Sequence, residues 1–330
     1  MISAAILHSL SVPAIRFRQR KDMKLYFAPL EGITTYTYRN THAEFFGGVD
    51  TYFSPFINPS EQEKVSRKGM RDILPENNRV ESLRVQVLTS NAQSFLKFCE
   101  KIKPLGYREV DINIGCPAGT VVRKGRGSGF LQFPDAIDSF LAEIFAKSDM
   151  KISVKTRTGY FSHDEFPRLL EIYNRYPLYE LTVHPRTREE LYRGQANADV
   201  FAKAYEPAKN PLCYNGDIRT VSDFEKIKTR FPDLSGVMLG RGAVMNPALF
   251  REIRGGERLR TEELVEFSKV LIERYRAVLG SDVFTLHKLK EIWIYVMWNF
   301  PEEKRVAKAI KKATTVSELI SAISSLPEIE

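Results

Sequence analysis

The stretch that decides the fold lies at residues 111–117 and reads DINIGCP. With the valine before it, its apolar side chains predict a short buried strand at 110–114, and Gly115 then permits a close approach of the backbone to a neighbour. Cys116 follows at the end of this strand, directly before a proline. Similar apolar runs recur along the chain with helical patterns between them, which is typical of βα units and a parallel sheet.

The number and spacing of these runs predict a (β/α)8 TIM barrel, because eight strands with intervening helices fill about 230 residues. The predicted strands span residues 25–30, 51–56, 85–88, 110–114, 152–156, 181–184, 212–214 and 237–239. The predicted helices span residues 37–46, 92–102, 134–145, 164–176, 198–205, 221–229 and 246–253. A doubly wound sheet is the alternative, but no GxGxxG motif follows the first strand.

The remainder of the chain is predicted to be helical, with helices at 261–279, 283–298, 302–313 and 316–325. Adjacent glycines at 255 and 256 indicate a domain boundary. We therefore expect a poorly ordered extension at 1–22, a barrel at 23–253 and a helical domain at 257–330. The extension is basic and has a mildly apolar start, so a transit peptide is its alternative interpretation.

The composition is that of a water-soluble globular protein, since 43% of the 330 residues are apolar and 27% are charged. The longest apolar runs, such as 292–297, are far shorter than the roughly 20 residues of a membrane-spanning helix, so no membrane contact is expected. Three widely spaced cysteines predict reduced thiols and a cytoplasmic location. No HExxH or similar spacing occurs, so no metal is predicted.

The formal charge is +8, and part of it falls in the N-terminal extension, where four basic residues face one acidic residue. On the predicted helix at 302–313, Lys304, Lys308 and Lys311 lie on one face at helical spacing, while apolar residues lie on another. A solvated surface and a nucleic-acid contact are the two interpretations of such a face.

Polar and glycine residues follow nearly every predicted strand, at the end where barrel active sites gather. A lysine directed into a barrel mouth is costly to bury unpaired, which singles out Lys155. Glycine turns at 215–217 and 240–241 match the phosphate site common in this fold and so predict a phosphorylated cofactor. The loop at 118–129 carries three basic residues among four glycines and is expected to close over an anionic ligand.

Six segments at the strand ends, taken together, resemble the tRNA-dihydrouridine synthases. They are residues 28–32, 111–117, 154–157, 183–187, 215–218 and 240–243, in the order and spacing of that family. The resemblance covers residues 25–247, and the helical remainder is similar to the family's C-terminal domain. It implies an FMN-bearing TIM barrel, followed by a helical tRNA-binding domain, that reduces uridine in tRNA with NADPH. No obligate protein partner is inferred.

Carried over by position, the resemblance makes Cys116 the proton donor and places Asn113 between flavin and uracil. Arg186 is expected to bind substrate, and the three lysines of the helix at 302–313 are expected to contact tRNA. The residues expected to bind the flavin are Pro29, Leu30, Glu31, Gln86, Lys155, His184, Asn215, Gly216, Asp217, Gly240 and Arg241. Among them, Gln86 is expected to meet the flavin ring, and the two glycine turns to hold its phosphate.

The implied reaction adds a hydride at C6 of uracil and a proton at C5 from the opposite face. A cysteine suits the second task because its ordinary pKa, near ~8.5, keeps it largely protonated at neutral pH. A base within folded tRNA must also be flipped out of its stack. Two alternatives remain open: a flavin-dependent reductase of a free pyrimidine or another small conjugated substrate, and a non-catalytic RNA-binding barrel.

Overall fold

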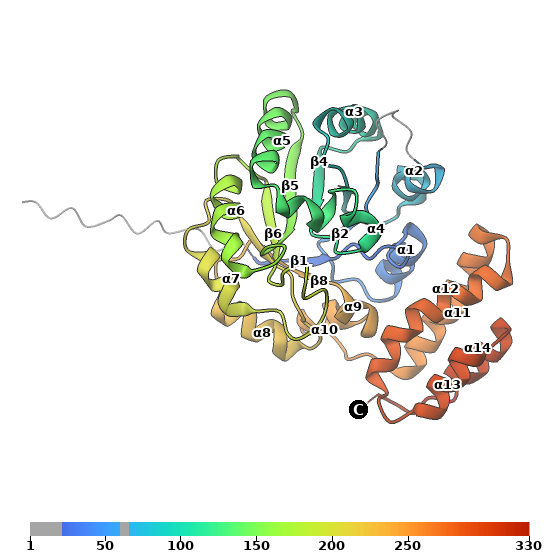
Figure 1. The fold of residues 1–330 in the computed structure, drawn as a ribbon. Coiled ribbons are helices and arrows are strands. Elements are labelled where there is room, and N and C mark those ends of the chain that lie inside the picture. The colour runs from blue at the N-terminus through green and yellow to red at the C-terminus, as the bar shows by residue number, and fades with distance from the viewer. Residues whose placement is uncertain (1–21, 60–65, 330) are drawn as a thin grey trace, which may run out of the picture.

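The computed structural model describes residues 22–59 and 66–329, in which the strands close into one parallel barrel (Figure 1). Each strand pairs with the next along the chain, and the first pairs with the last. The strands are β1 (Lys24–Phe27), β2 (Thr51–Phe53), β3 (Leu83–Val87), β4 (Glu109–Ile114), β5 (Lys151–Arg157), β6 (Glu180–His184), β7 (Leu212–Tyr214) and β8 (Gly236–Leu239). The predicted TIM barrel is confirmed, and the doubly wound alternative is wrong. The extension predicted at 1–22 falls, apart from Asp22, outside the described residues.

Helices surround the barrel and continue alone after β8 (Figure 1). Those of the barrel are α1 (Tyr36–Phe45), α2 (Arg67–Ile73), α3 (Ala92–Ile102), α4 (Gly119–Val122), α5 (Pro134–Lys147), α6 (Phe166–Tyr173), α7 (Ala198–Tyr205), α8 (Val221–Arg230), α9 (Arg241–Met245) and α10 (Leu249–Ile253). Those of the C-terminal region are α11 (Thr261–Leu279), α12 (Asp282–Val296), α13 (Lys304–Lys312) and α14 (Val316–Ile323). Five short 3-10 turns complete the described segments: η1 (Pro75–Asn77), η2 (Lys103–Leu105), η3 (Gly127–Gln132), η4 (His163–Glu165) and η5 (Met297–Asn299).

Two predicted strands end early because a proline follows each. The N–H of Ala28 still donates to the carbonyl of Leu239 at 2.8 Å, but Pro29 has no N–H to continue the ladder. Pro55 follows β2 in the same way. The regular pairing is therefore interrupted at these points, although Ile57 pairs once more with Val87 of β3. Pro29 and Phe56 line a cavity at the mouth of the barrel.

Several helices differ from the prediction. The helix predicted at 246–253 begins later, as α10, because the proline at 247 disfavours helical backbone at Asn246, which has φ −115° and ψ 94°. The preceding helix, α9, lies outside the predicted range and was not predicted. α2 was not predicted, since its seven residues are mostly polar. Its start is marked by Ser66, whose side chain accepts a hydrogen bond from the N–H of Gly69 at 3.0 Å.

The alternation of side chains along β4 places two polar residues inside the barrel. Val110, Ile112 and Ile114 are fully buried in the apolar core that the barrel shares with its helices. Asp111 and Asn113, two residues apart, instead join polar side chains of the neighbouring strands. The strand that the sequence singles out therefore presents its polar face to the barrel interior, below the mouth.

The other end of the barrel is closed by a buried polar cluster. The guanidinium of Arg84 lies 3.0 Å from the carboxylate of Glu180, which also accepts a hydrogen bond from the hydroxyl of Tyr26 at 2.9 Å. All three side chains are buried. Each buried charge in this cluster therefore has a partner, and the three side chains fill this end of the barrel interior.

The C-terminal helices lie beside the barrel, next to α1 (Figure 1). Phe267 of α11 packs edge-on against Tyr38 of α1, with ring centroids 5.7 Å apart. The amide of Asn299, just after α12, donates to the carbonyl of Met245 at the end of α9 at 2.6 Å. One continuous apolar core joins the two regions, so the C-terminal helices hold a fixed position against the barrel. No helix in the described segments has the length and apolar character needed to cross a lipid bilayer.

Candidate active site at the mouth of the barrel

An open cavity lies at the carboxyl ends of the strands, with an empty volume of about 960 Å³ that includes open solvent. Twelve of the predicted site residues line it: Pro29, Leu30, Glu31, Asn113, Cys116, Lys155, His184, Asn215, Gly216, Asp217, Gly240 and Arg241. Gln86, Arg186 and the three lysines of α13 do not. Within the described part of the chain, no group of three or more His, Cys, Asp or Glu side chains is placed to hold a metal ion.

The backbone of Cys116 is held on both sides. Its N–H donates to the side-chain oxygen of Asn113 at 2.8 Å. Its carbonyl accepts hydrogen bonds from both the N–H and the hydroxyl of Ser128, each at 3.0 Å. Gly127 makes this contact possible, because a Cβ there would lie 2.7 Å from the same carbonyl. The loop predicted to close over a ligand is therefore seated against Cys116.

The surroundings of Cys116 favour the protonated thiol. Burial raises the pKa of Cys116, and a backbone hydrogen bond at Ala118 and the nearby charges of Lys155 and Arg157 oppose that rise without cancelling it. At neutral pH the group is therefore a thiol with a proton to give. This differs from a nucleophilic cysteine, whose pKa is lowered.

Lys155 lies beside Asn113 in the register of β4 and β5 and lines the cavity. Burial lowers its pKa to about 8, and the positive charge of Arg157 acts in the same direction. Across residues 22–59 and 66–329, no hydrogen bond or ion pair engages its ammonium group. Lys155 is half-buried at the cavity wall, where an ammonium without a partner is costly, so this group is free to meet an electron-rich atom of a ligand.

His184 is held in one tautomer. The guanidinium of Arg186 lies 3.3 Å from Nε2, and because a guanidinium can only donate, Nε2 carries the lone pair. The proton then resides on Nδ1 and is donated to the carbonyl of Asn215 at 2.5 Å. Burial lowers the pKa of His184 well below its usual range, and neighbouring cations add to this. His184 is therefore neutral and is no source of a proton at neutral pH.

Arg186 is buried behind His184 and is absent from the cavity wall. It donates to the carbonyls of Arg193 and Gly194, and so braces the loop that follows β6. It also pairs with Asp217, whose carboxylate further accepts from Arg241 at 3.0 Å. In this position its guanidinium orders the loop and shares Asp217 with Arg241, and the substrate contact expected of Arg186 stays a prediction.

Gln86 lies one layer below the cavity instead of on its wall. Its Nε2 donates to Asp111 at 2.7 Å, and its Oε1 accepts from the amide of Asn113 at 2.8 Å. Asp111 also accepts a hydrogen bond from Ser153 at 2.5 Å. These contacts fix the amide of Asn113 so that its oxygen faces the N–H of Cys116. Sequence reasoning did not single out Asp111, although its two-residue spacing from Asn113 signals a shared face.

Two further residues of the site were not predicted. The ring of Tyr192, in the loop after β6, is 52% exposed and lines the cavity. Two guanidinium groups lie against it, with Arg157 at 5.2 Å and Arg241 at 4.8 Å from its centroid. Arg157 also donates to the carbonyl of Gly115, which ties the loops after β4 and β6 together. An aromatic residue in a loop at a barrel mouth was the available signal for Tyr192.

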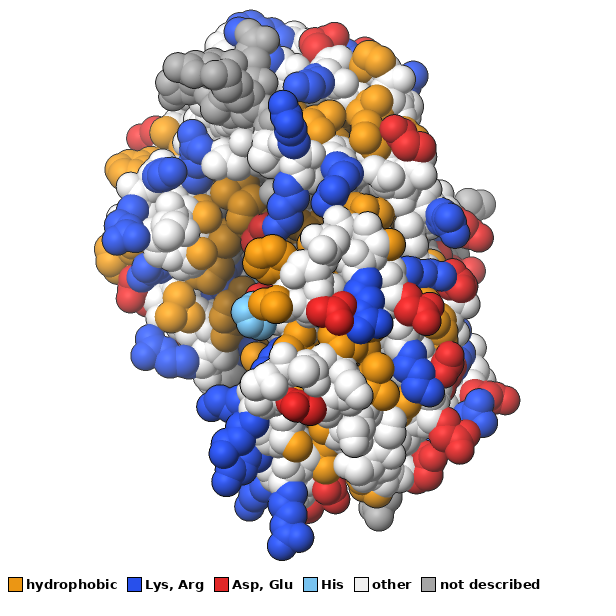
Figure 2. All heavy atoms as spheres, turned by 90° about the vertical axis from the view of Figure 1, so that its right-hand side faces the viewer, with side chains coloured by type: hydrophobic (Ala, Val, Ile, Leu, Met, Phe, Trp, Pro, Cys, Tyr) orange, Lys and Arg blue, Asp and Glu red, His pale blue; other side chains and the backbone are white. Residues whose placement is uncertain are grey.

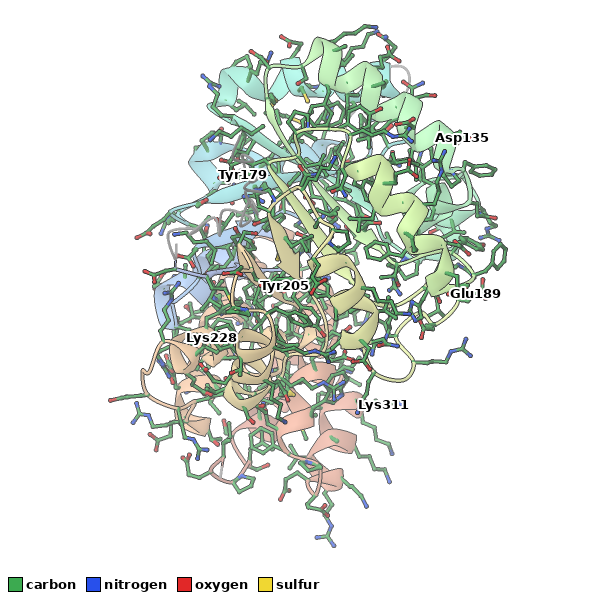
Figure 3. All side chains as sticks on the ribbon, turned by 90° about the vertical axis from the view of Figure 1, so that its left-hand side faces the viewer. Asp135, Tyr179, Glu189, Tyr205, Lys228 and Lys311 are labelled. Carbon is green, nitrogen blue, oxygen red and sulfur yellow. The ribbon has the colours of Figure 1, made fainter. Side chains whose placement is uncertain are left out.

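The basic face of α13 lies outside the cavity but on the same side of the molecule. Lys304, Lys308 and Lys311 are exposed, while Val306 and Ile310 pack inward. Figure 3 shows Lys311 on the same side as Glu189, from the loop after β6, whereas Tyr179, just before β6, lies opposite. Figure 2 shows basic side chains gathered on the lower part of the face that carries the C-terminal helices.

The overall shape is shared with proteins of low sequence similarity. Histamine dehydrogenase from Rhizobium sp. 4-9 gives a TM-score of 0.54 at 13% identity, over 70% of this chain and 45% of that one. TcOYE with pHBA gives a TM-score of 0.51 at 9% identity, over 70% of this chain and 88% of that one. At these identities the likeness concerns the fold alone.

Similarity in sequence is more specific. The family model described as Dihydrouridine synthase (Dus) matches residues 26–325. The tRNA-dihydrouridine synthase B of Escherichia coli strain K12 is 29% identical over 262 residues, which cover 77% of this chain and 79% of that protein. The protein of the same name from Klebsiella pneumoniae is 28% identical over 314 residues, covering 91% of this chain and 95% of its own. Since the family model spans the barrel, the cavity and most of the helical region, the chain belongs to the dihydrouridine synthase family.

Proposed function

We propose that this protein is a tRNA-dihydrouridine synthase that reduces the C5–C6 double bond of uridines in tRNA, with FMN as cofactor and NADPH as reductant. The observation that carries the proposal is the position of Cys116, a protonated thiol with a fixed backbone in the same cavity wall as the unpartnered Lys155. Membership of the dihydrouridine synthase family supports it. In this proposal the barrel at 23–253 carries the chemistry, and residues 257–330 bind tRNA.

The residues at the cavity fit a flavin mononucleotide. Ala28 and Met238 offer apolar surface to a flat ring, and the ammonium of Lys155 is available to an electron-rich ring atom. The first N–H groups of α9 have no acceptor within the helix, and Arg241 stands beside them, which suits a phosphate. Asp217 would act here by holding Arg241 in place, since its own carboxylate would repel a phosphate.

The cofactor, when bound, supplies hydride chemistry that no amino-acid side chain offers. The chain's own part is to hold the uracil and to give a proton at C5, which we assign to the thiol of Cys116. Asn113 keeps one amide hydrogen for a ligand, because the other is donated to Gln86. Lys155 is placed to stabilise negative charge that develops on the uracil carbonyl side. Neutral His184 forms part of the cavity wall, and the lone pair on its Nε2 is directed at Arg186.

The tRNA must deliver a flipped base to the cavity, at a cost of a few kcal/mol. Contacts from Lys304, Lys308 and Lys311 to phosphates would offset part of that cost, because each releases bound counterions. A tRNA substrate and reduced thiols agree with the cytoplasmic location expected from the sequence. No obligate protein partner is required by this scheme, since the residues that hold and protonate the uracil all belong to one chain.

The test is to incubate the purified protein with FMN, NADPH and a tRNA transcript that lacks modifications, and to measure dihydrouridine by mass spectrometry of the digested RNA. We expect dihydrouridine in the transcript and none from free uridine. Turnover of free uridine with no reaction on the transcript would instead identify a reductase of free pyrimidines. Binding of the transcript by a protein that takes up no flavin would identify an RNA-binding barrel without catalysis.

A further inference from the structure

Trp298 lies in η5, where the C-terminal helices meet the barrel, and its side chain remains 40% exposed. The guanidinium of Arg219 lies over its ring, 5.0 Å from the centroid. Arg219 itself lines the cavity. Arg219 therefore contacts both Trp298 and the cavity that would receive a flipped base.

The joint between the two regions does not depend on this ring. The neighbouring residue, Asn299, already anchors the segment through its hydrogen bond to Met245. Trp293, five residues earlier, supplies the buried indole of the C-terminal core and is only 1% exposed. Ile294, four residues before Trp298, is 64% exposed, so the apolar surface here extends beyond a single ring.

Rigid neighbours hold the ring in place. Tyr295 packs edge-on against Trp298, with centroids 5.5 Å apart. Burial raises the pKa of the Tyr295 phenol; Tyr192 adds to the rise and the charge of Arg241 opposes it, which places this phenol beside two residues of the cavity rim. A fixed aromatic side chain costs little conformational entropy when a ligand stacks on it.

Basic residues lie near Trp298 both at the cavity rim and further along the chain. Arg219 and Arg241 lie at the cavity rim, and the basic face of α13 begins six residues after Trp298, within roughly 21 Å of extended chain. Within the described segments, Lys304, Lys308 and Lys311 form no ion pair. Exposed aromatic surface between basic groups is the arrangement that binds unstacked nucleotides.

We propose that Trp298, with Arg219 over its ring, is a stacking platform for a base of the tRNA that flanks the nucleotide entering the cavity. The inference rests on the proposed function. It adds a contact between Trp298 and the flanking base that offsets the stacking energy lost when the target base is flipped out. When a base leaves its stack, its neighbour loses a stacking partner, and the indole replaces it.

The experiment uses the flavin-loaded protein, a full-length unmodified tRNA transcript, and two readouts: the affinity from filter binding and the quenching of tryptophan fluorescence. The chain has two tryptophans, and the buried one gives a constant background. We expect tRNA to quench the emission of the wild-type protein, and Trp298→Phe to remove the quenching. Trp298→Ala should lower tRNA affinity by roughly 5- to 150-fold, and Trp298→Phe by less.

The matched control is Phe284→Ala, on the same helix region but near its other end, where the ring is 62% exposed. This variant should retain both the quenching and the affinity. Tight tRNA binding without quenching, or unchanged affinity in Trp298→Ala, would overturn the platform while leaving the proposed function intact. A wild-type protein that does not bind tRNA would overturn both.

Discussion

The side-chain oxygen of Asn113 lies 2.8 Å from the backbone nitrogen of Cys116 and accepts its hydrogen bond. The same amide donates to Gln86, which in turn donates to Asp111. A buried carboxylate in the barrel interior is thus connected, through two amides, to the backbone of the residue that we assign as the acid. Because Gln86 accepts from the Asn113 nitrogen, the amide oxygen of Asn113 is turned toward the N–H groups of Gly115 and Cys116.

Replacing Gln86 with leucine should therefore misplace Asn113 without touching the cavity wall. Asp111 and Asn113 would each lose a buried partner, and we expect the free energy of unfolding to fall by about 1–3 kcal/mol. Turnover should fall while the KM for tRNA stays near that of the wild type. The control Gln93→Leu removes an exposed amide whose partner is Glu143 and should change stability by less than about 0.5 kcal/mol. Equal effects of the two variants would contradict the positioning role.

Lys155 makes a prediction about pH. Because its pKa is lowered to about 8 in the folded state, the folded protein without ligand should gain stability as pH rises from about 8 toward the unfolded value near ~10.4. Lys155→Met removes this gain, so the variant should be more stable than the wild type at pH 7, by up to about 3 kcal/mol. Urea unfolding of the flavin-free proteins across this range measures the difference. If the difference in unfolding free energy between wild type and Lys155→Met stays constant across this pH range, the charged ammonium of Lys155 does not destabilise the folded protein.

The buried ion pair between Arg186 and Asp217 leads to a prediction about stability. The guanidinium of Arg186 is 1% exposed, so Asp217→Asn would leave a buried charge without its carboxylate. We expect a loss of roughly 3 kcal/mol in unfolding free energy and weaker retention of FMN, since Arg241 also loses its anchor. Asp199→Asn breaks the exposed pair with Arg230 and should cost at most about 1 kcal/mol. Similar losses of unfolding free energy in Asp217→Asn and Asp199→Asn would contradict the idea that the burial of Arg186 makes its ion pair important for stability.

The basic face of α13 predicts a salt dependence. If Lys304, Lys308 and Lys311 each contact a phosphate, replacing all three with glutamine should reduce the slope of log affinity for tRNA against log salt by about 2–3. The control replaces Lys226, Lys228 and Arg230 of α8; Figure 3 shows Lys228 on the opposite side of the molecule from Lys311. An unchanged slope in the α13 variant would show that this face is merely solvated.

The fold was predictable from the sequence because the barrel repeats one local pattern, a short apolar strand followed by an amphipathic helix. The bounds of β7, α3, α7 and α11 match the predicted ranges. The differences arise where one residue overrides a pattern, as Pro29 does for β1, or where a short polar helix such as α2 lacks apolar periodicity.

Many of the residues that line the cavity were predictable because the carboxyl ends of parallel barrel strands meet at one mouth. That convergence brings Asn113, Cys116, Lys155 and His184 to one cavity. It does not reveal whether a polar residue faces the cavity or lies beneath it, which depends on side-chain packing across strands. Gln86, which was expected to meet the flavin ring, lies beneath the cavity and holds the amide of Asn113, and its contact with the flavin stays a prediction.

The central claim is that Cys116 donates the proton to C5 of a tRNA uridine. Its most direct test is the rate of dihydrouridine formation, measured by mass spectrometry on an unmodified transcript, for wild type and Cys116→Ala loaded with equal amounts of FMN. We expect the variant to bind flavin and tRNA normally and to form dihydrouridine about 10²- to 10⁴-fold more slowly. Dihydrouridine formation by Cys116→Ala at the wild-type rate would contradict the claim.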